Sequence, residues 1–208
     1  GRSKDVGTAL EEQIAEDVHT APKVERILQA AFVWARDHGR GRITMADKSN
    51  AVPAHQLWQR LFAEVGARFP EIEREHYYID ALCMQLVKQP DHFQVIVTNN
   101  MFGDIVSDLG SQLVGGLGVA PSANLHPGRA GLFEPVHGSA PKYAGQGTAN
   151  PVATILTGAL MLEQLGLPEA ASRVVHAVRA TLAQGIRTRD LGGRASTDDV
   201  ARAVAAVV

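Results

Sequence analysis

The chain has 208 residues, and 45% of them are hydrophobic, which is enough for one ordinary domain or two small ones. Its 20 Lys and Arg residues against 22 Asp and Glu residues give a formal charge of -2, which excludes a general attraction to nucleic acid or acidic membranes. A single cysteine, Cys83, excludes an internal disulfide. No apolar run is long enough to cross a membrane and no secretory signal opens the sequence, so a cytoplasmic protein is expected.

Helices and strands are predicted to alternate along the first half of the chain. A helix is expected over 20–38, because Val24, Leu28 and Ala31 recur at helical spacing and Gly39 follows. Further strands are predicted by short runs rich in β-branched and aromatic residues, and further helices by the helical apolar period. The expected strands are 41–47, 72–80 and 93–98, and the expected helices are 53–69, 81–88 and 101–113.

The second half begins with a segment rich in Gly and Pro, 115–131, which predicts a turn-rich connection between two structural regions. A strand end and a long loop are expected over 131–151. Helices are predicted over 151–166, 168–185 and 197–208. The alternation of strands and helices indicates an α/β architecture with a sheet that is at least partly parallel.

Two acidic residues, Asp104 and Asp108, lie four residues apart in the predicted helix 101–113. Residues at this spacing share a face of a helix, and two like charges there destabilise it unless a cation lies between them. A hard divalent ion such as Mg²⁺ or Mn²⁺, bound by the carboxylate oxygens, would neutralise this repulsion. The same pattern also fits a solvated helix face whose acids complement the helix dipole, and spacing alone leaves both interpretations open.

Two further polar residues follow predicted strands. Asp80 follows the strand residues 74–79 and begins a helix, and Lys48 comes directly after 41–47. The carboxyl ends of parallel strands are where α/β proteins place their ligands. Asp80 is equally compatible with a helix cap and Lys48 with an exposed surface lysine.

Five segments together resemble a known family. They are DKSNAV, HYYIDALCMQLV, VTNNMFGDIVSDLGSQLVGGLGVAPSANL, LFEPVHGSAPKYAGQGTANP and DLGG. In this order they are similar to the signature of the isocitrate/isopropylmalate dehydrogenase family of metal-dependent decarboxylating dehydrogenases, which includes tartrate and homoisocitrate dehydrogenases. The resemblance implies an isopropylmalate-dehydrogenase-like α/β/α sandwich that is incomplete at the N-terminus. It places residues 1–110 in the small, dimer-forming domain and 111–208 in the C-terminal part of the large, cofactor-binding domain.

The resemblance also assigns roles around the two acids. It implies that Asp80, Asp104 and Asp108 bind a Mg²⁺ or Mn²⁺ ion, and that Lys48 and Asp80 are catalytic, with Lys48 helping to move the proton at the substrate hydroxyl. Asn50 corresponds to a residue close to the nicotinamide and substrate. Members of the family are homodimers with shared active sites, in which Lys48 and Asp80 come from one subunit and the pair Asp104 and Asp108 from the other.

A cofactor loop is implied by the same resemblance. The dinucleotide's adenosine half is expected on His137, Gly138, Ser139, Ala140 and Pro141, with Asn150 beside the adenine. Lys142 and Tyr143 stand where NAD-dependent relatives have an aspartate, so NADP is expected in preference to NAD; a lysine attracts the 2′-phosphate that an aspartate would repel. Arg189 and Arg194 are candidates for the same phosphate and equally for ordinary surface arginines.

The expected function is oxidative decarboxylation of a 3-substituted (2R)-malate, such as isocitrate, isopropylmalate, homoisocitrate or tartrate, with NADP or NAD and a divalent metal. No counterpart is found for the family's N-terminal strands, substrate-binding arginines and catalytic tyrosine, so a fragment of a longer product or a shortened relative is expected. The alternative is a catalytically silent or regulatory homologue that binds nucleotide or pairs with a full-length subunit. A third interpretation is a short protein whose nucleotide loop serves an unrelated reaction.

Overall fold

The computed structural model describes residues 1–126 and 130–208, and the chain forms two compact units, Gly1–Ile105 and Val106–Val208. Residues 127–129, which fall in the predicted turn-rich connection 115–131, lie outside the described part. The boundary between the units lies within helix α4 (Asn100–Leu113), as does the boundary expected after residue 110.

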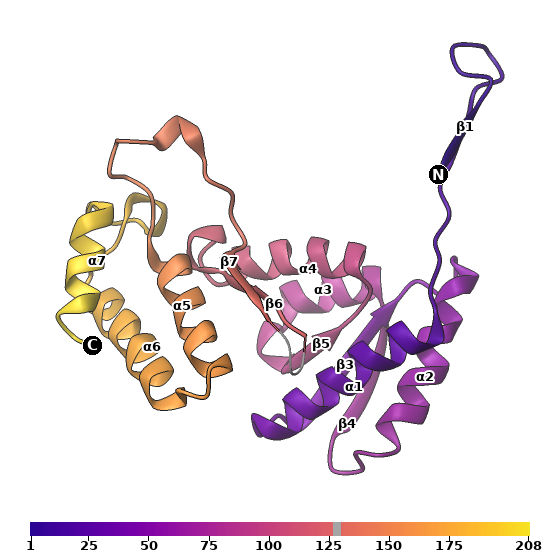
Figure 1. Cartoon of the computed structure of the whole chain (residues 1–208), viewed down its shortest axis with the longest axis horizontal. Helices are drawn as coiled ribbons and strands as arrows, with labels where there is room; N and C mark the ends of the chain where they lie inside the picture. Colours follow the sequence, from indigo (N-terminus) through magenta and orange to yellow (C-terminus); the bar gives the residue numbers. More distant parts are fainter. Residues whose placement is uncertain (127–129) are drawn as a thin grey trace. The chain divides into compact units, whose positions relative to one another are not determined.

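The first unit is built on a three-stranded parallel sheet (Figure 1). Its strands are β3 (Arg42–Asp47), β4 (Glu73–Tyr78) and β5 (Val95–Val97), in the order β4-β3-β5. Residues 43–47 of the central strand are buried on both faces, as expected for a parallel strand covered by helices on both sides. The sheet confirms the predicted α/β class and all three strands expected in this region.

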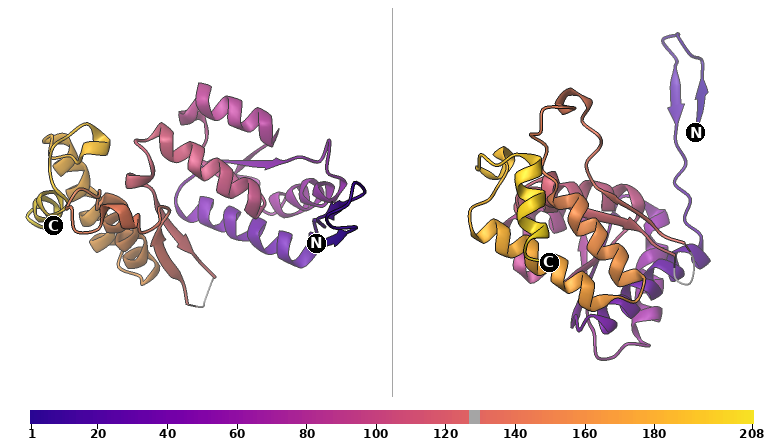
Figure 2. Two further views of the ribbon diagram at one scale, coloured as in Figure 1. Left: turned by 90° about the horizontal axis from the view of Figure 1, so that it is seen from above. Right: turned by 60° about the vertical axis from the view of Figure 1, so that its left-hand side comes forward.

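Helices cover both faces of this sheet (Figure 2). Helix α1 (Ala21–Asp37) and helix α2 (Gln56–Gly66) enclose the main core with the sheet, and α3 (Ile79–Lys88) packs against β3 and β4 from the other side. Right-handed crossovers explain this arrangement, because the chain moves to one side of β3 to form β4 and then back past it to form β5. The helices expected over 20–38, 53–69, 81–88 and 101–113 are confirmed.

An additional hairpin precedes the sheet, formed by β1 (Arg2–Lys4) and β2 (Glu12–Ile14) in antiparallel register. It was not predicted from the sequence. Figure 1 shows it extending away from the sheet of its own unit, and nearly all of its residues are exposed. Each strand has three residues without an apolar face, so the sequence contains no alternating pattern by which the hairpin could be recognised.

The second unit combines a hairpin with three helices. Strands β6 (Pro121–Asn124) and β7 (Leu132–Pro135) pair antiparallel, and the helices are α5 (Val152–Gln164), α6 (Pro168–Ala183) and α7 (Thr197–Ala205). The prediction that 115–131 forms only a turn-rich connection is wrong for 121–124, which form strand β6. The proline and small residues of this strand carry no strand signal, and the strand is stabilised by pairing with β7. The three helices are confirmed, and their buried cluster consists of Val152, Ala177, Val178, Val200 and Val204.

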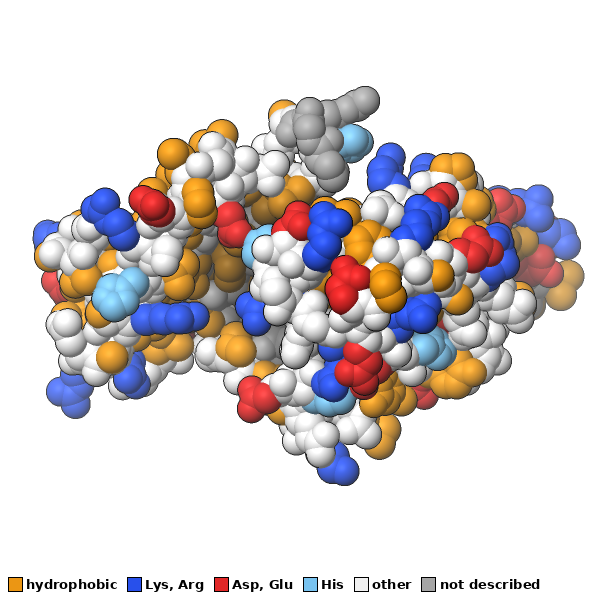
Figure 3. All heavy atoms as spheres, turned by 90° about the horizontal axis from the view of Figure 1, so that it is seen from below, with side chains coloured by type: hydrophobic (Ala, Val, Ile, Leu, Met, Phe, Trp, Pro, Cys, Tyr) orange, Lys and Arg blue, Asp and Glu red, His pale blue; other side chains and the backbone are white. Residues whose placement is uncertain are grey.

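Short helical turns complete the described chain. They are η1 (Pro53–His55), η2 (Pro90–His92), η3 (Leu117–Val119), η4 (Pro141–Tyr143) and η5 (Arg189–Leu191). Within residues 1–126 and 130–208, no helix is both long and apolar enough to span a membrane. On the face drawn in Figure 3, acidic and basic side chains are interspersed, in keeping with the small net charge.

Candidate functional site

The two residues that follow strands β3 and β4 meet in the structure. The strands run in parallel register with Asp47 opposite Tyr78, so their carboxyl ends lie side by side. Lys48 opens the turn after β3, and Asp80 lies in the first turn of α3 directly after β4. Lys48 Nζ donates a hydrogen bond of 2.7 Å to Asp80 Oδ1. The parallel sheet therefore joins an ammonium and a carboxylate that are 32 residues apart in sequence.

This ion pair is open to solvent on the carboxylate side. The side chain of Asp80 is 66% exposed and that of Lys48 is 26% exposed. The hydrogen bond from Lys48 lowers the pKa of Asp80, and the peptide N–H groups at the start of α3 lower this pKa further. Asp80 is thus an anion at neutral pH, in the form that can bind a cation. Because exposed pairs contribute little to stability, the contact serves mainly to hold the two groups in place.

The backbone around Lys48 is held by side chains that the sequence analysis did not single out. The Lys48 N–H donates to Nδ1 of the buried His55 over 3.1 Å. Asp47 Oδ1 accepts from the Ser49 N–H and hydroxyl, each at 3.0 Å, and lies 3.1 Å from His76 Nε2. No periodicity or motif marks His55, since its position depends on the tertiary fold.

The predicted acidic pair lies on helix α4. Asp104 and Asp108 are one turn apart and both are exposed. Their oxygen ligands suit Mg²⁺ or Mn²⁺. Asp104 belongs to the first unit and Asp108 to the second. The chemistry of these two carboxylates and of Asp80 fits a hard divalent ion.

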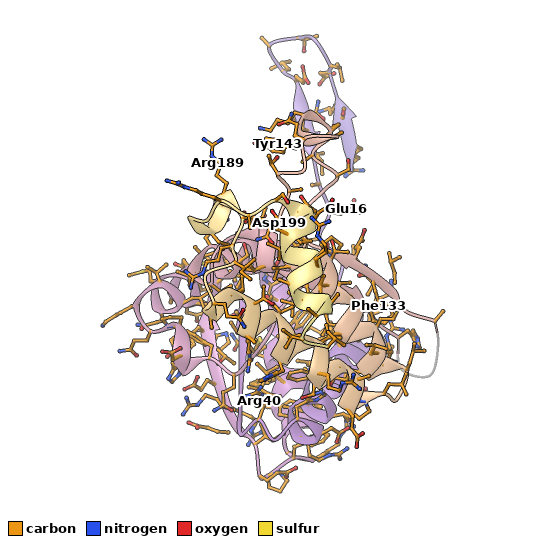
Figure 4. The ribbon with its side chains drawn as sticks, turned by 90° about the vertical axis from the view of Figure 1, so that its left-hand side faces the viewer. Glu16, Arg40, Phe133, Tyr143, Arg189 and Asp199 are labelled. Carbon is orange, nitrogen blue, oxygen red and sulfur yellow. The ribbon has the colours of Figure 1, made fainter. Side chains whose placement is uncertain are left out.

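The predicted cofactor loop borders a hollow of about 940 Å³ in the second unit. Six of the expected residues line it: His137, Gly138, Ser139, Ala140, Tyr143 and Asn150. Pro141 and Lys142 belong to the same loop, in η4, and are not among the lining residues. Lys142 Nζ lies 4.7 Å from the centre of the Tyr143 ring. Figure 4 shows Tyr143 and Arg189, a further lining residue, at the same end of this unit.

The shape of this hollow depends on close backbone packing. Ala140 has a φ of 43°, a left-handed conformation that turns the loop before η4. Asn150 Nδ2 donates to Asp190 Oδ2 over 2.8 Å. Gly118 packs against this pair so closely that a Cβ there would lie 2.6 Å from Asp190 Oδ2. Any larger residue at 118 would therefore displace the Asn150 and Asp190 side chains.

The start of helix α7 forms another wall, which includes Thr197 and Asp198. A capping box fixes this end: the Ser196 hydroxyl accepts from the Asp199 N–H, and Asp199 Oδ2 accepts from the Ser196 N–H at 3.0 Å. The sequence analysis predicted this helix but did not assign its first residues to a site. The Ser-x-x-Asp spacing at 196–199 is the sequence signal for this capped start.

Two other candidates lie elsewhere. Asn50 is in the exposed turn after β3, within the first unit. Arg194 is exposed and does not line the hollow, whereas Arg189 does. The sequence had left both arginines open as phosphate ligands, and only Arg189 lies where it could contact a ligand in the hollow.

Comparison with known proteins identifies the family. The sequence profile described as isocitrate/isopropylmalate dehydrogenase matches residues 2–204. The chain belongs to the isocitrate/isopropylmalate dehydrogenase family. The 3-isopropylmalate dehydrogenase of Zymomonas mobilis is 47% identical over 187 residues, which are 89% of this chain and 53% of that protein. The corresponding enzyme of Archaeoglobus fulgidus is 48% identical, over 92% of this chain and 59% of its own length.

A solved structure confirms the fold of this family. The isocitrate dehydrogenase from Methylococcus capsulatus superposes with a TM-score of 0.88 at 41% identity, covering 97% of this chain and 60% of the enzyme. The predicted resemblance and the isopropylmalate-dehydrogenase-like α/β fold are therefore confirmed. The chain spans about half the length of the curated relatives that it matches.

Proposed function

We propose that this chain carries the metal-binding and dinucleotide-binding residues of an oxidative decarboxylase that acts on a 3-substituted (2R)-malate. The relatives named above are 3-isopropylmalate and isocitrate dehydrogenases. The observation that carries the proposal is the contact of 2.7 Å between Lys48 and Asp80, where the carboxyl ends of β3 and β4 meet. This contact joins a proton-transferring group to a metal-ligand type at the edge where α/β proteins bind ligands.

Lys48 serves as the proton-transferring group in this proposal. Its ammonium donates to Asp80 and has two further N–H groups for a substrate oxygen. As an ammonium it can deliver a proton, and it must first lose one in order to accept the proton of the substrate hydroxyl. The ion pair with Asp80 orients Nζ, and orientation of a reacting group is a major part of rate enhancement.

Asp80, Asp104 and Asp108 would hold the divalent cation. When bound, such an ion polarises the hydroxyl and carboxylate oxygens of a malate and stabilises negative charge that develops on them. The contribution of this chain is to present carboxylates as anions. The lowered pKa of Asp80 supports this role, because a protonated acid binds a hard cation poorly.

The hollow of the second unit would receive the dinucleotide, with NADP preferred. Lys142 contacts the face of the Tyr143 ring, which lines the hollow. Arg189 lines the same hollow, so two cations are available for a 2′-phosphate. Gly138 and Gly145 keep the loop that borders the ligand free of side chains, and Asn150 offers its amide at the wall.

A homodimer with shared sites would bring the metal ligands together. Apolar side chains on two helices of the first unit support a covered surface there. Met84 and Val87 on α3 are 73% and 58% exposed, and Met101 and Ile105 on α4 are 62% and 56% exposed. Large apolar residues in neighbouring turns are unusual on a free surface and typical of an interface.

The proposal is tested by reduction of NADP and NAD by the purified chain with Mn²⁺ and a panel of isocitrate, isopropylmalate, homoisocitrate, tartrate and malate. We expect metal-dependent turnover of a 3-substituted malate, lost by a factor on the order of 1,000 in Lys48→Met. His176→Gln, on the exposed face of α6, is the matched control. Equal rates for the chain and Lys48→Met would refute the role of Lys48.

A second candidate function is favoured by the hollow of the second unit, which can bind a nucleotide without a metal site. The chain could serve as a silent subunit that binds nucleotide there and pairs with a longer homologue. This alternative predicts NADP binding by the purified chain without turnover of any acid in the panel. Turnover by the chain alone rejects it.

A further inference from the structure

Outside the proposed metal and nucleotide residues, the first unit contains a second cluster of polar side chains. Asp17, just before α1, lies between the rings of His19 and His55. His19 Nε2 lies 2.9 Å from Asp17 Oδ1, and His55 Nε2 lies 3.0 Å from Asp17 Oδ2. One carboxylate thus contacts both imidazoles, one through each oxygen.

Hydrogen bonds on the far side of each ring fix its tautomer. Nδ1 of His55 accepts from the Lys48 peptide N–H at 3.1 Å, and Nδ1 of His19 accepts from the Trp58 indole N–H at 3.1 Å. A neutral imidazole has one N–H and one acceptor nitrogen. Since Nδ1 is the acceptor in both rings, Nε2 carries the hydrogen, and the Asp17 carboxylate accepts the N–H of His55. His19 Nε2 lies close to the other carboxylate oxygen without forming a hydrogen bond to it.

The same reasoning argues against a metal ion at this cluster. Three potential ligand atoms lie within 4.8 Å of one another, as a zinc site would require. A metal-bound histidine, however, normally donates its other N–H to an acceptor. Here both Nδ1 atoms face N–H donors, so neither ring can offer a lone pair at Nε2 while it remains neutral. The arrangement is that of a hydrogen-bonded network.

The network ends at the backbone of Lys48. His55 is 1% exposed, so its ring has little freedom to move, and it also packs edge-on against Phe102 at 5.5 Å. The side-chain amide of Asn99 lies 3.3 Å from His55 Nε2, but Asp17 is the acceptor that this N–H requires. The Lys48 peptide N–H is the first donor after strand β3, so its partner sets the direction in which the chain leaves the sheet.

We propose that His55, oriented by Asp17, is a positioning residue that fixes the backbone of Lys48 and so directs its ammonium to Asp80. The inference rests on the proposed function, in which Lys48 transfers the proton. His19 and Trp58 act one step further away, because His19 lies against the second oxygen of the Asp17 carboxylate and Trp58 donates to His19. The segment before α1 thereby stabilises the turn that carries Lys48.

Two substitutions of His55 separate this role from simple packing. In His55→Asn, Oδ1 takes the place of Nδ1 and still accepts from the Lys48 N–H, while the contact to Asp17 is lost. In His55→Gln, the side-chain NH₂ takes the place of Nε2 and keeps Asp17, while the acceptor for Lys48 is lost. Both variants remove the ring, so a packing role predicts similar behaviour for the two.

Amide hydrogen exchange of the full chain, followed by NMR, tests the proposal without any need for activity. We expect exchange at Lys48 to be about tenfold or more faster in His55→Gln and close to the parent rate in His55→Asn. Ile43 and Met45, in the middle of β3, should stay protected in both variants, and His176→Gln should change nothing. Equal exchange at Lys48 in the two His55 variants would overturn the proposal.

The ring nitrogens give a second, independent measurement. In the unsubstituted chain, ¹⁵N shifts should show an unprotonated Nδ1 and a protonated Nε2 for His19 and His55. A protonated Nδ1 in His55, or stoichiometric Zn²⁺ binding that His19→Ala abolishes, would overturn the hydrogen-bonded network.

Turnover then connects the network to the reaction. If the chain is active, we expect kcat to fall on the order of 100-fold in His55→Gln and much less in His55→Asn, with KM for the nucleotide unchanged in both. Equal kcat values in the two variants would contradict the positioning role. A chain without turnover would count against the proposed function, while hydrogen exchange would still decide the role of His55.

Discussion

The two units of the chain differ in how their interiors are built and in what those interiors support. Among the described residues, the first unit buries a cluster of thirteen apolar side chains, with Phe32 packed against Phe62 and Phe69 at ring distances of 5.5 and 5.1 Å. The corresponding cluster in the second unit has five members, all valine or alanine. The larger core holds strand ends that support a short ion pair, whereas the second unit shapes its hollow by polar contacts such as the one from Asn150 to Asp190.

The largest effect should come from the aromatic core of the first unit. Phe32→Ala removes a ring that is 0% exposed, and we expect unfolding of this unit to become easier by about 3–5 kcal/mol. Urea unfolding followed by tryptophan fluorescence measures this loss of stability, because both tryptophans, Trp34 and Trp58, lie in the first unit. Val178→Ala should lower the free energy of unfolding of the second unit by only about 2 kcal/mol, measured by hydrogen exchange in α6. Equal losses of stability in the two variants would show that the two cores contribute equally to the stability of their units.

The next effect concerns the hollow of the second unit. Lys142→Asp replaces a cation beside Tyr143 by an anion, and we expect NADP affinity to fall about 10- to 100-fold while NAD affinity is retained. Isothermal titration with each nucleotide measures the ratio. Lys88→Asp, at the end of α3 in the first unit, is the matched charge control. An unchanged ratio would show that Lys142 does not contact the 2′-phosphate.

A smaller effect is expected at the start of α7. Ser196→Ala removes the hydroxyl that accepts from the Asp199 N–H, at a cost of about 1 kcal/mol in the second unit. Exchange of the first amides of α7 should become faster, and nucleotide affinity should fall slightly because Thr197 and Asp198 line the hollow. Ser196→Thr, which retains a hydroxyl, should behave like the parent. Loss of the first unit's tryptophan transition in Ser196→Ala would contradict the separation of the two units.

The smallest effect is a shift in titration within the first unit. The hydrogen bond from Lys48 lowers the pKa of Asp80, so the pair persists as the pH falls below the ordinary range of an aspartate and is lost as the pH falls through the lowered pKa. Lys48→Met should raise the pKa of Asp80 towards its usual value, as measured by ¹³C NMR of the carboxyl group. Lys48→Arg, which keeps a cation, should leave it lowered. An unchanged pKa in Lys48→Met would mean that the ion pair does not form in solution.

The sequence predicted the elements of both units well, and the reason is local. Helical spacing in α1 and α6 and β-branched runs in β3 and β5 are properties of neighbouring residues, so they could be recognised without the fold. Strand β6 was missed because Pro121 and its small neighbours carry no strand signal and depend on pairing with β7. The hairpin of β1 and β2 was missed because its three-residue strands have no alternating apolar face.

Part of the candidate site was predictable from the sequence. Lys48 and Asp80 were marked by their positions after predicted strands, the family resemblance gave their expected roles and the loop from His137 to Tyr143, and the ion pair itself follows from parallel strand register. Asp17 and His55 are 38 residues apart and carry no motif, so only the structure joins them. Polar networks of this kind depend on side-chain placement that no periodic pattern encodes.

In the proposed homodimer, Asp80 of one copy and the pair Asp104 and Asp108 of another bind one divalent ion. This shared site is tested most directly by Mn²⁺ binding to Asp80→Asn, to the double variant Asp104→Asn/Asp108→Asn, and to an equal mixture of the two after subunit exchange. We predict that neither variant alone binds the ion, and that the mixture recovers about one quarter of the original sites, because half of the dimers are mixed and each mixed dimer has one intact site. A mixture that binds no more Mn²⁺ than its separate components would contradict the shared site.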